Sequence, residues 1–228
     1  MIEFSVAAVL WDMDGTLIDS EPLWIEAQTQ MVAEHGGSWS HEDGLRLVGS
    51  DMHFTAVALQ GVGVRLSVVE ITERLTDEVI AALRARVLWR PGAVELVSAL
   101  ALAGVKQAIV TTSARSMASL VADALPPGAI HSIVAGEDVV RGKPDPEPYL
   151  LAAERLGVSP ASCVAIEDSP TGLAAAIAAG TVAIGAPNDA PLVEASTWTR
   201  LQSLAGTTLR DLEAVVASTR PPWRERAR

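Results

Sequence analysis

The sequence predicts an α/β protein in which helices cover both faces of a parallel sheet and an all-helical domain is inserted near the start. Two observations lead to this fold class. From about residue 93 onward, short apolar runs alternate with segments of helical periodicity, as in sheets whose parallel strands are joined by helices. Between the first apolar run and this region, the chain has only helical patterns. We therefore expect a core of residues 1–19 and 90–218, an inserted helical domain at 20–89, and a flexible tail at 219–228.

The first elements follow from residue types and from the signals that mark helix ends. Residues 6–11 form a β-branched and apolar run, which favours a strand buried on both faces. A helix is expected to follow, with Ser20 as its N-cap and Pro22 in its first turn. This helix should end at residues 36–37, where two glycines stand together.

The inserted domain is expected to stay helical from residue 40 to about residue 88. Ser40 with Asp43, and Ser67 with Glu70, have the spacing of capping boxes, in which a serine and an acid three residues later bind each other's main-chain N–H groups. The apolar residues after the second box recur with the period of a helix: Val68, Ile71, Leu75, Val79, Ala82 and Leu83.

The remainder of the chain repeats a helix followed by a strand. The expected helices are 93–103, 114–125, 147–156 and 170–179, each followed by a glycine or by a Pro-Pro-Gly turn. The expected strands lie in the runs "VKQAIVT", "AIHSIVA", "SCVAIED" and "TVAIG".

Composition argues against several classes of function. The net charge is −11 and the basic residues form no stripe, so a nucleic-acid partner is not expected. The stretch "GLAAAIAAGTVAIGAP" is shorter than the roughly 20 residues of a membrane span, and the N-terminus lacks the pattern of a signal peptide. The single cysteine, Cys163, excludes an internal disulfide and is interpreted as a buried, inert strand residue. We therefore expect a cytoplasmic protein with no membrane partner.

Polar side chains follow four of the expected strands, directly after three of them and past a loop after "AIHSIVA", where Lys143 stands. This set comprises Asp12, Asp14, Thr111, Thr112, Ser113, Lys143, Glu167 and Asp168. Because the carboxyl ends of parallel strands meet at one edge of the sheet, where doubly wound folds bind their ligands, we expect these side chains to converge. A single acid after a strand is readily explained as a helix cap, but that explanation is improbable for all four clusters together.

Rival motifs fail on their spacing. "DMDGT" begins like the calcium loop of an EF-hand, but positions six and twelve, which require Gly and Glu, hold Leu17 and Leu23. "GEDVVRGKP" approaches a phosphate-binding P-loop, but it has one residue too many between its glycines, and Pro144 stands where Ser or Thr belongs. The four histidines show no metal-ligand spacing.

Several carboxylates gathered with one lysine favour metal-assisted phosphoryl transfer. Carboxylate oxygens favour a hard cation such as Mg²⁺, and an aspartate can itself accept a phosphoryl group. Two unit charges ~4 Å apart interact by ~4 kcal/mol at an effective dielectric of 20, so Asp12 can approach a phosphate only if Mg²⁺ and Lys143 offset the repulsion. Asp14 is placed to exchange a proton with the leaving oxygen and the attacking water. Gly15 lets the backbone turn close to the phosphate.

Four stretches resemble the motifs of the haloacid dehalogenase-like (HAD) superfamily: "DMDGTLIDSEPLW", Thr111 after an apolar strand, "GKPDPEPY" and "AIEDSPTGLAAAIAAG". The resemblance runs from about residue 6 to residue 187. The subgroup looks like the β-phosphoglucomutase-like sugar phosphatases, including the 2-deoxyglucose-6-phosphate and hexitol-phosphate phosphatases. It implies a Rossmann-like core, an inserted α-helical cap domain and Mg²⁺-dependent phosphoryl transfer. The implied partner is a small phosphorylated metabolite, a sugar phosphate.

The resemblance also implies a role for each matching residue. Asp12 would be the nucleophile and Asp14 the general acid/base, while Thr111 would bind the transferring phosphoryl group. Lys143 would hold that group and Asp12 in place. The metal would be held by Asp12, the Asp14 carbonyl and Asp168, with Glu167 assisting. The implied substrate contacts are Gly15, Thr112, Ser113, Arg115 and Trp24.

Departures from the family pattern bear on the activity. The dehalogenase branch lacks the second acid of the first motif, so Asp14 favours phosphate over carbon–halogen chemistry. β-Phosphoglucomutases carry a cap histidine where Trp24 stands and a cap arginine where Met52 stands, which favours a phosphatase over a mutase. A sugar phosphomutase and a non-catalytic binding module stay open as alternatives. Arg115 is equally explained as a solvated helix residue, and the sequence predicts neither the sugar nor the oligomeric state.

Overall fold

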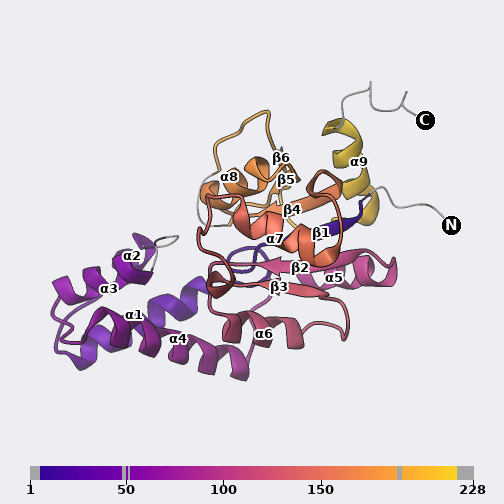
Figure 1. Ribbon diagram of the computed structural model, residues 1–228. Helices are drawn as coiled ribbons and strands as arrows, with labels where there is room; N and C mark the ends of the chain where they lie inside the picture. The colour runs from indigo at the N-terminus through magenta and orange to yellow at the C-terminus, as the bar shows by residue number, and fades with distance from the viewer. Residues whose placement is uncertain (1–5, 48–49, 51, 189–191, 220–228) are drawn as a thin grey trace. The chain divides into compact units, whose positions relative to one another are not determined.

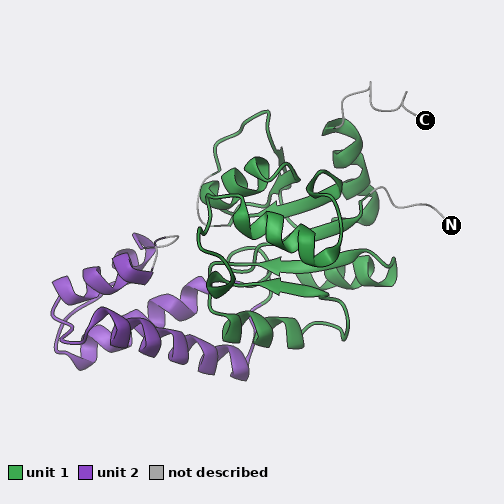
Figure 2. Cartoon of the chain, in the orientation of Figure 1, with its two compact units in different colours: residues 1–18, 89–228 green, residues 19–88 purple. Residues whose placement is uncertain are grey.

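The structure, a computed structural model, describes residues 6–47, 50, 52–188 and 192–219. The chain divides into two compact units (Figure 2): unit 1 is Met1–Ile18 with Trp89–Arg228, and unit 2 is Asp19–Leu88. The predicted flexible tail lies outside the described residues, apart from Thr219.

Unit 1 contains a sheet of six parallel strands in the order β3-β2-β1-β4-β5-β6 (Figure 1). The strands are β1 (Ala8–Trp11), β2 (Lys106–Val110), β3 (Ser132–Val134), β4 (Cys163–Glu167), β5 (Val182–Gly185) and β6 (Thr199–Arg200). Leu10 of β1 lies opposite Ala108 of β2 on one side and Ala165 of β4 on the other. All of β1 is buried, which explains its uninterrupted apolar run. The predicted α/β class with a parallel sheet is confirmed.

Helices of unit 1 cover both faces of this sheet. They are α5 (Ala93–Leu102), α6 (Arg115–Asp123), α7 (Glu147–Leu156), α8 (Pro170–Ala178) and α9 (Leu209–Thr219), with short 3-10 turns η1 (Gly136–Asp138) and η2 (Pro160–Ser162). Apolar residues of α7 and α8 form one core with Ala8, Leu10 and the residues of β2 and β4 that share their face. On the opposite face, the buried Gln107 side chain accepts from Trp11 Nε1 at 2.9 Å and donates to the Val97 carbonyl of α5 at 3.0 Å.

Unit 2 is entirely helical in its described part. It consists of α1 (Glu21–Glu34), α2 (His41–Leu45), α3 (Met52–Gly61) and α4 (Val68–Ala85). Both predicted capping boxes are present, at the starts of α2 and α4. The predicted apolar stripe of α4 buries Ile71, Leu75, Val79 and Leu83.

The predicted cap at Ser20 is wrong in one respect. Ser20 does precede α1, but its side chain accepts no capping hydrogen bond. Its backbone is right-handed helical rather than extended, and its carbonyl oxygen accepts from the N–H groups of Leu23 and Trp24 instead. Pro22 at the second helical position has no N–H group to be capped.

The point of insertion is a short two-stranded ribbon. The N–H of Asp19 donates to the carbonyl of Leu88 at 2.7 Å within unit 2. Within unit 1, the N–H of Arg90 donates to the carbonyl of Leu17 at 2.9 Å, and Ile18 forms an antiparallel bridge with Trp89. The chain therefore leaves and re-enters the core side by side.

Two elements, β6 and α9, were not predicted from the sequence. Two further expectations can be compared with the structure. Cys163 opens β4 and is buried, and burial raises the pKa of its thiol to about 11, in keeping with an inert residue. Among the helices of the described residues, none combines the length and apolar character needed to cross a bilayer.

Candidate active site

Neighbouring strands bring the predicted acids and hydroxyls to one edge of the sheet. Asp12 follows β1, and its N–H donates to the carbonyl of Ile166 at 3.0 Å, which extends the pairing with β4 by one step. Thr111 follows β2, and its N–H donates to the carbonyl of Val134 at 2.9 Å. Because these strands are parallel, the residue after each one lies at the same end of the sheet.

Lys143 is the centre of a buried charge cluster. Its Nζ lies 2.7 Å from Asp12 Oδ1 and 2.6 Å from Glu167 Oε1, and it also donates to the Val110 carbonyl at 2.9 Å. The lysine side chain is 6% exposed. Burial lowers the pKa of its ammonium, but the charges of Asp12 and Glu167 outweigh this effect and raise the pKa above its usual value. Lys143 is therefore held in its charged form.

Glu167 is fully buried and makes contacts beyond Lys143. Its Oε1 accepts from the Tyr149 hydroxyl at 2.5 Å, and its Oε2 accepts from Ser169 Oγ at 3.2 Å. Burial, and next the charge of Asp12, raise the pKa of Glu167 to about 7, against the lowering effect of Lys143. A methyl group at Gly172 would lie 1.9 Å from Glu167 Oε2, so only glycine leaves room for this carboxylate.

Three carboxylates of this edge are arranged to hold a cation. One oxygen each of Asp12, Glu167 and Asp168 lie within 4.8 Å of one another. Asp12 Oδ2 is buried and has no hydrogen-bond partner, although a buried carboxylate oxygen ordinarily has one. A Cβ at Gly15, whose φ is +82°, would lie 1.9 Å from Asp168 Oδ2, so glycine is needed for the loop to pass this acid. The residues fit a hard divalent cation such as Mg²⁺.

The side chain of Asp14 points to a different set of partners. Its Oδ2 accepts from Ser113 Oγ at 2.6 Å and from Thr111 Oγ1 at 3.3 Å, and the N–H of Ser113 donates to Thr111 Oγ1 at 3.0 Å. The Asp14 carboxylate is not one of the three carboxylates gathered above. The resemblance assigned its carbonyl, rather than its carboxylate, to the metal.

Three predicted substrate contacts, Thr112, Arg115 and Trp24, lie outside the buried charge cluster. Thr112 is exposed beside the Thr111–Ser113 pair. The guanidinium of Arg115 forms an ion pair with Asp138, and its main-chain N–H donates to the Glu137 carboxylate, so both groups are occupied within unit 1. Trp24 lies half-buried on α1 of unit 2, and its role as a substrate contact stays a prediction.

Tyr149 is the residue of this site that the sequence did not single out. It lies on α7, is fully buried, and places its ring with the centroid 5.4 Å from Lys143 Nζ while its hydroxyl binds Glu167. Burial and the charge of Glu167 raise the pKa of this phenol well above its usual value, so it remains a hydrogen-bond donor. The only signal was its place six residues after Lys143 in "GKPDPEPY".

The fold and this edge of the sheet define an α/β protein with a buried carboxylate–lysine centre, suited to chemistry on an anionic substrate. The family model for haloacid dehalogenase-like hydrolases matches residues 6–180. The chain belongs to this family.

Several proteins to which this chain is similar are named as phosphatases. The chain is 35% identical over 189 residues to hexitol phosphatase A of Escherichia coli (strain K12), covering 80% of this chain and 84% of that protein. It is 30% identical over 175 residues to a phosphorylated carbohydrates phosphatase of Thermotoga maritima, covering 76% and 81%. The solved structure of CbbY from Rhodobacter sphaeroides with phosphate matches with a TM-score of 0.77 at 28% identity, covering 88% of this chain and 96% of that one. The predicted family is confirmed, and the predicted phosphoric monoester hydrolase agrees with these phosphatases.

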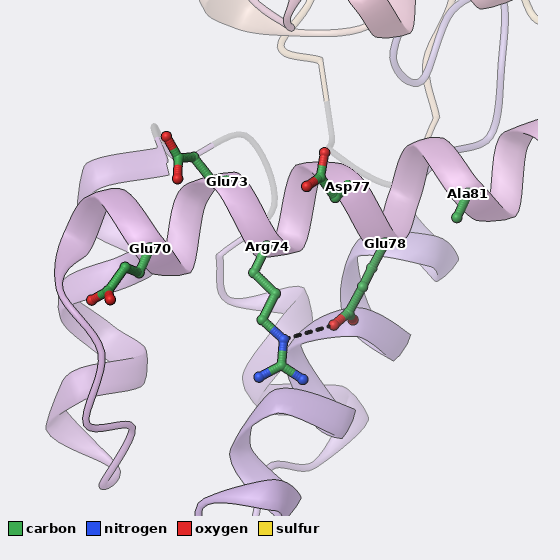
Figure 3. Close-up of a pocket in the computed structure, with 6 residues that line it drawn as sticks. All are labelled: Glu70, Glu73, Arg74, Asp77, Glu78 and Ala81. Carbon is green, nitrogen blue, oxygen red and sulfur yellow. Dashed lines mark hydrogen bonds and ion pairs between the residues drawn. The ribbon is translucent and has the colours of Figure 1, made fainter.

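A hollow lies on the surface of α4 in unit 2. Its lining residues are Glu70, Glu73, Arg74, Asp77, Glu78 and Ala81 (Figure 3). Arg74 Nε donates to Glu78 Oε1 at 3.1 Å within this group, and the same guanidinium pairs with Glu34 of α1. Charges of this kind are typical of the solvated face of an amphipathic helix, and the hollow adds nothing to the functional argument.

Proposed function

We propose that this chain is a Mg²⁺-dependent phosphatase that hydrolyses small sugar phosphate monoesters through an aspartyl-phosphate on Asp12. One observation carries the proposal: Asp12 has one oxygen held by Lys143 and the other buried without a hydrogen-bond partner, in a carboxylate that is grouped with those of Glu167 and Asp168. A carboxylate arranged in this way suits both an attack on phosphorus and a shared metal. The names of the relatives support the substrate class.

In the first half of the proposed reaction, an oxygen of Asp12 attacks the phosphorus and the bond from phosphorus to the ester oxygen breaks. Asp14 donates a proton to the departing oxygen, and the products are a free alcohol and aspartyl-phosphate. Lys143 fixes Asp12 and offsets negative charge as the two anions approach. Thr111 is the proposed donor to the transferring group. Mg²⁺, held by Asp12, the Asp14 carbonyl and Asp168 with help from Glu167, would supply further neutralisation of phosphate charge.

In the second half, Asp14 takes a proton from a water molecule as that water attacks the phosphorus of aspartyl-phosphate. The bond between phosphorus and the Asp12 oxygen breaks, inorganic phosphate leaves, and Asp12 returns as a carboxylate. Asp14 thus donates one proton and recovers one in each cycle, so the enzyme ends the cycle unchanged.

The finer parts of the proposal concern the substrate and its surroundings. We propose that unit 2 acts as the cap that selects the sugar, with Trp24, Gly15 and Thr112 among the substrate contacts. A contact from Arg115 would require its guanidinium to leave Asp138. The single, buried cysteine supports a cytoplasmic setting.

The test is a screen of sugar phosphates that measures both inorganic phosphate and isomerised sugar phosphate, with and without EDTA. Wild-type protein is expected to release phosphate in Mg²⁺ and to stop in EDTA. Asp12→Asn should reduce release to background while the variant stays folded, as a cooperative unfolding transition shows. Asp123→Asn, which removes an exposed carboxylate at the end of α6, is the matched control and should remain active.

The other outcomes separate the alternatives. Isomerised product in excess of phosphate would make the chain a phosphomutase. Undiminished turnover by Asp12→Asn would remove the nucleophile assignment. A wild-type protein that binds sugar phosphates without EDTA-sensitive hydrolysis would be a binding module.

A further inference from the structure

The carboxylate of Asp14 is held by the loop that follows β2. Ser113 Oγ donates to Asp14 Oδ2 at 2.6 Å, which is a short bond between a hydroxyl and a carboxylate, and Thr111 Oγ1 adds a longer one at 3.3 Å to the same oxygen. The two hydroxyls are not equivalent. Thr111 Oγ1 also accepts the N–H of Ser113 at 3.0 Å, whereas Ser113 directs its own hydroxyl at the acid.

We infer that Ser113 is a positioning residue, which orients Asp14 for proton transfer rather than binding the sugar. The inference rests on the proposed function, because Asp14 transfers protons only if the chain hydrolyses phosphate esters. Asp14 lies on the turn "DMDGT" after β1, while Ser113 lies after the neighbouring strand β2. A hydrogen bond across these two loops fixes one carboxylate oxygen and thereby the direction of the other, and proton transfer depends steeply on such orientation.

The leaving group distinguishes this role from the substrate contact that the resemblance implies for Ser113. A poorly acidic alcohol needs a proton as it departs, whereas p-nitrophenol leaves readily as an anion. Substituted phenyl phosphates span this range without carrying any sugar hydroxyl. For them, kcat/KM reports the steps up to departure of the leaving group, which is the half-reaction in which Asp14 acts as an acid.

The experiment compares kcat/KM of wild type and Ser113→Ala across p-nitrophenyl, chlorophenyl, phenyl and methoxyphenyl phosphates in Mg²⁺. We expect p-nitrophenyl phosphate to be hydrolysed almost as well by the variant. The loss should grow along the series to roughly 10- to 100-fold for the least acidic phenols, because general acid catalysis contributes about 10²- to 10⁴-fold and Ser113 controls only its orientation. In Asp14→Asn, kcat/KM should also fall more steeply as the leaving phenol becomes less acidic, and at least as steeply as in Ser113→Ala.

Two further variants test whether the loss in Ser113→Ala comes from the missing hydroxyl rather than from a disturbed loop. Ser113→Thr keeps a hydroxyl, so its kcat/KM should vary with the acidity of the leaving phenol almost as it does in the wild type. Ser116→Ala removes an exposed hydroxyl in the first turn of α6 and should change nothing. Unfolding midpoints of all variants are measured alongside.

Equal losses across the series in Ser113→Ala would assign Ser113 to phosphate binding or to the fold, and no loss would leave it without a role. Either result overturns the inference, as would an unchanged dependence in Asp14→Asn. These failures differ from failure of the proposed function, in which the wild-type protein itself shows no EDTA-sensitive hydrolysis.

Discussion

At the scale of single residues, the candidate site depends on two glycines, Gly15 and Gly172, whose lack of a side chain leaves room for the acids. Gly15 turns the chain with φ +82° and passes so close to Asp168 that a Cβ would lie 1.9 Å from its Oδ2. In the proposed metal site, Asp168 can lie beside Asp12 because the loop at Gly15 has no side chain in the way. Gly172 does the same for Glu167 from the start of α8.

We predict that Gly15→Ala lowers both the stability and the apparent affinity for Mg²⁺. The positive φ should cost ~1–2 kcal/mol, and the displaced Asp168 should raise the Mg²⁺ concentration needed for half-maximal activity. Gly180→Ala is the matched control, because Gly180 has φ +78° but open space at its Cβ. Urea unfolding and Mg²⁺ titrations of activity measure the two effects. Equal behaviour of the two variants in the Mg²⁺ titration would contradict the contact with Asp168.

Lys143 should be the ion-pair partner on which stability depends most. Lys143→Met leaves Asp12 and Glu167 facing each other without compensation, and removing one partner of a buried pair costs ~3–5 kcal/mol. Arg141→Met, which breaks a surface pair between a 68% exposed arginine and Asp145, should cost ~0–1 kcal/mol. Urea unfolding at pH 8 gives both values. A loss for Lys143→Met as small as that for Arg141→Met would show that the buried cluster relaxes freely.

Most of the site could be predicted at this scale, and the reason is topological. Asp12 and Asp168 come directly after β1 and β4, and Lys143 lies in the connection that follows β3, so their convergence at one end of the sheet needs no knowledge of side-chain conformation. The bond from Ser113 to Asp14 and the contacts of Tyr149 depend on rotamers and on packing between α7 and the sheet. One sequence carries no signal for these.

At the scale of elements, Asp138 connects the segment after β3 with the helices α6 and α7. Its carboxylate accepts from the N–H of Ala135, and it pairs with Arg115 of α6 and Arg155 of α7. Burial acts to raise the pKa of Asp138, but the bonds from Arg155, Ala135 and Arg115 outweigh it and hold the pKa well below the usual 3.8.

This contact should make part of the stability dependent on pH. Because the folded state holds the pKa below 3.8, the charged carboxylate stabilises the fold fully above that value. The contribution is lost as the pH falls through 3.8 toward the folded pKa. We predict that Asp138→Asn is less stable than wild type at pH 7 and that the difference shrinks by pH 3. Urea unfolding at several pH values measures it, with Asp123→Asn as the control. A difference that stays constant with pH would contradict the role of the charge.

Elements with long periodic patterns were predicted well, and the misses have physical causes. The strand β6 has two residues, Thr199 and Arg200, too few to form any pattern. The helix α9 was missed although Thr208 and Asp211 have capping-box spacing and do bind each other, so a signal was present. Helix ends shifted by one or two residues, as for 114–125 against Arg115–Asp123, because final turns fray.

At the scale of the whole molecule, the chain combines a net charge of −11 with a group of three buried carboxylates, two of which pair with Lys143. A divalent cation that binds only the folded state stabilises it by RT ln(1 + [Mg²⁺]/Kd), or ~2.7 kcal/mol at 100 times Kd. We predict that Mg²⁺ raises the melting temperature and that EDTA reverses the rise. The shift should be smaller in Asp168→Asn and unchanged in Asp123→Asn, as measured by scanning calorimetry. An equal shift in both variants would place the ion elsewhere.

The ribbon at which the helical unit joins the core has a consequence for how such proteins diversify. A main-chain hydrogen bond joins Arg90 to Leu17 within the core, and another joins Asp19 to Leu88 within the insert. The two ends of the insert are therefore already paired with each other. A foreign segment with a similarly closed base could be grafted between residues 18 and 89 without disturbing β1, the strand that Asp12 follows. With unit 2 as the proposed selector of the sugar, such an exchange would change which substrate is accepted and leave the proposed catalytic residues in place.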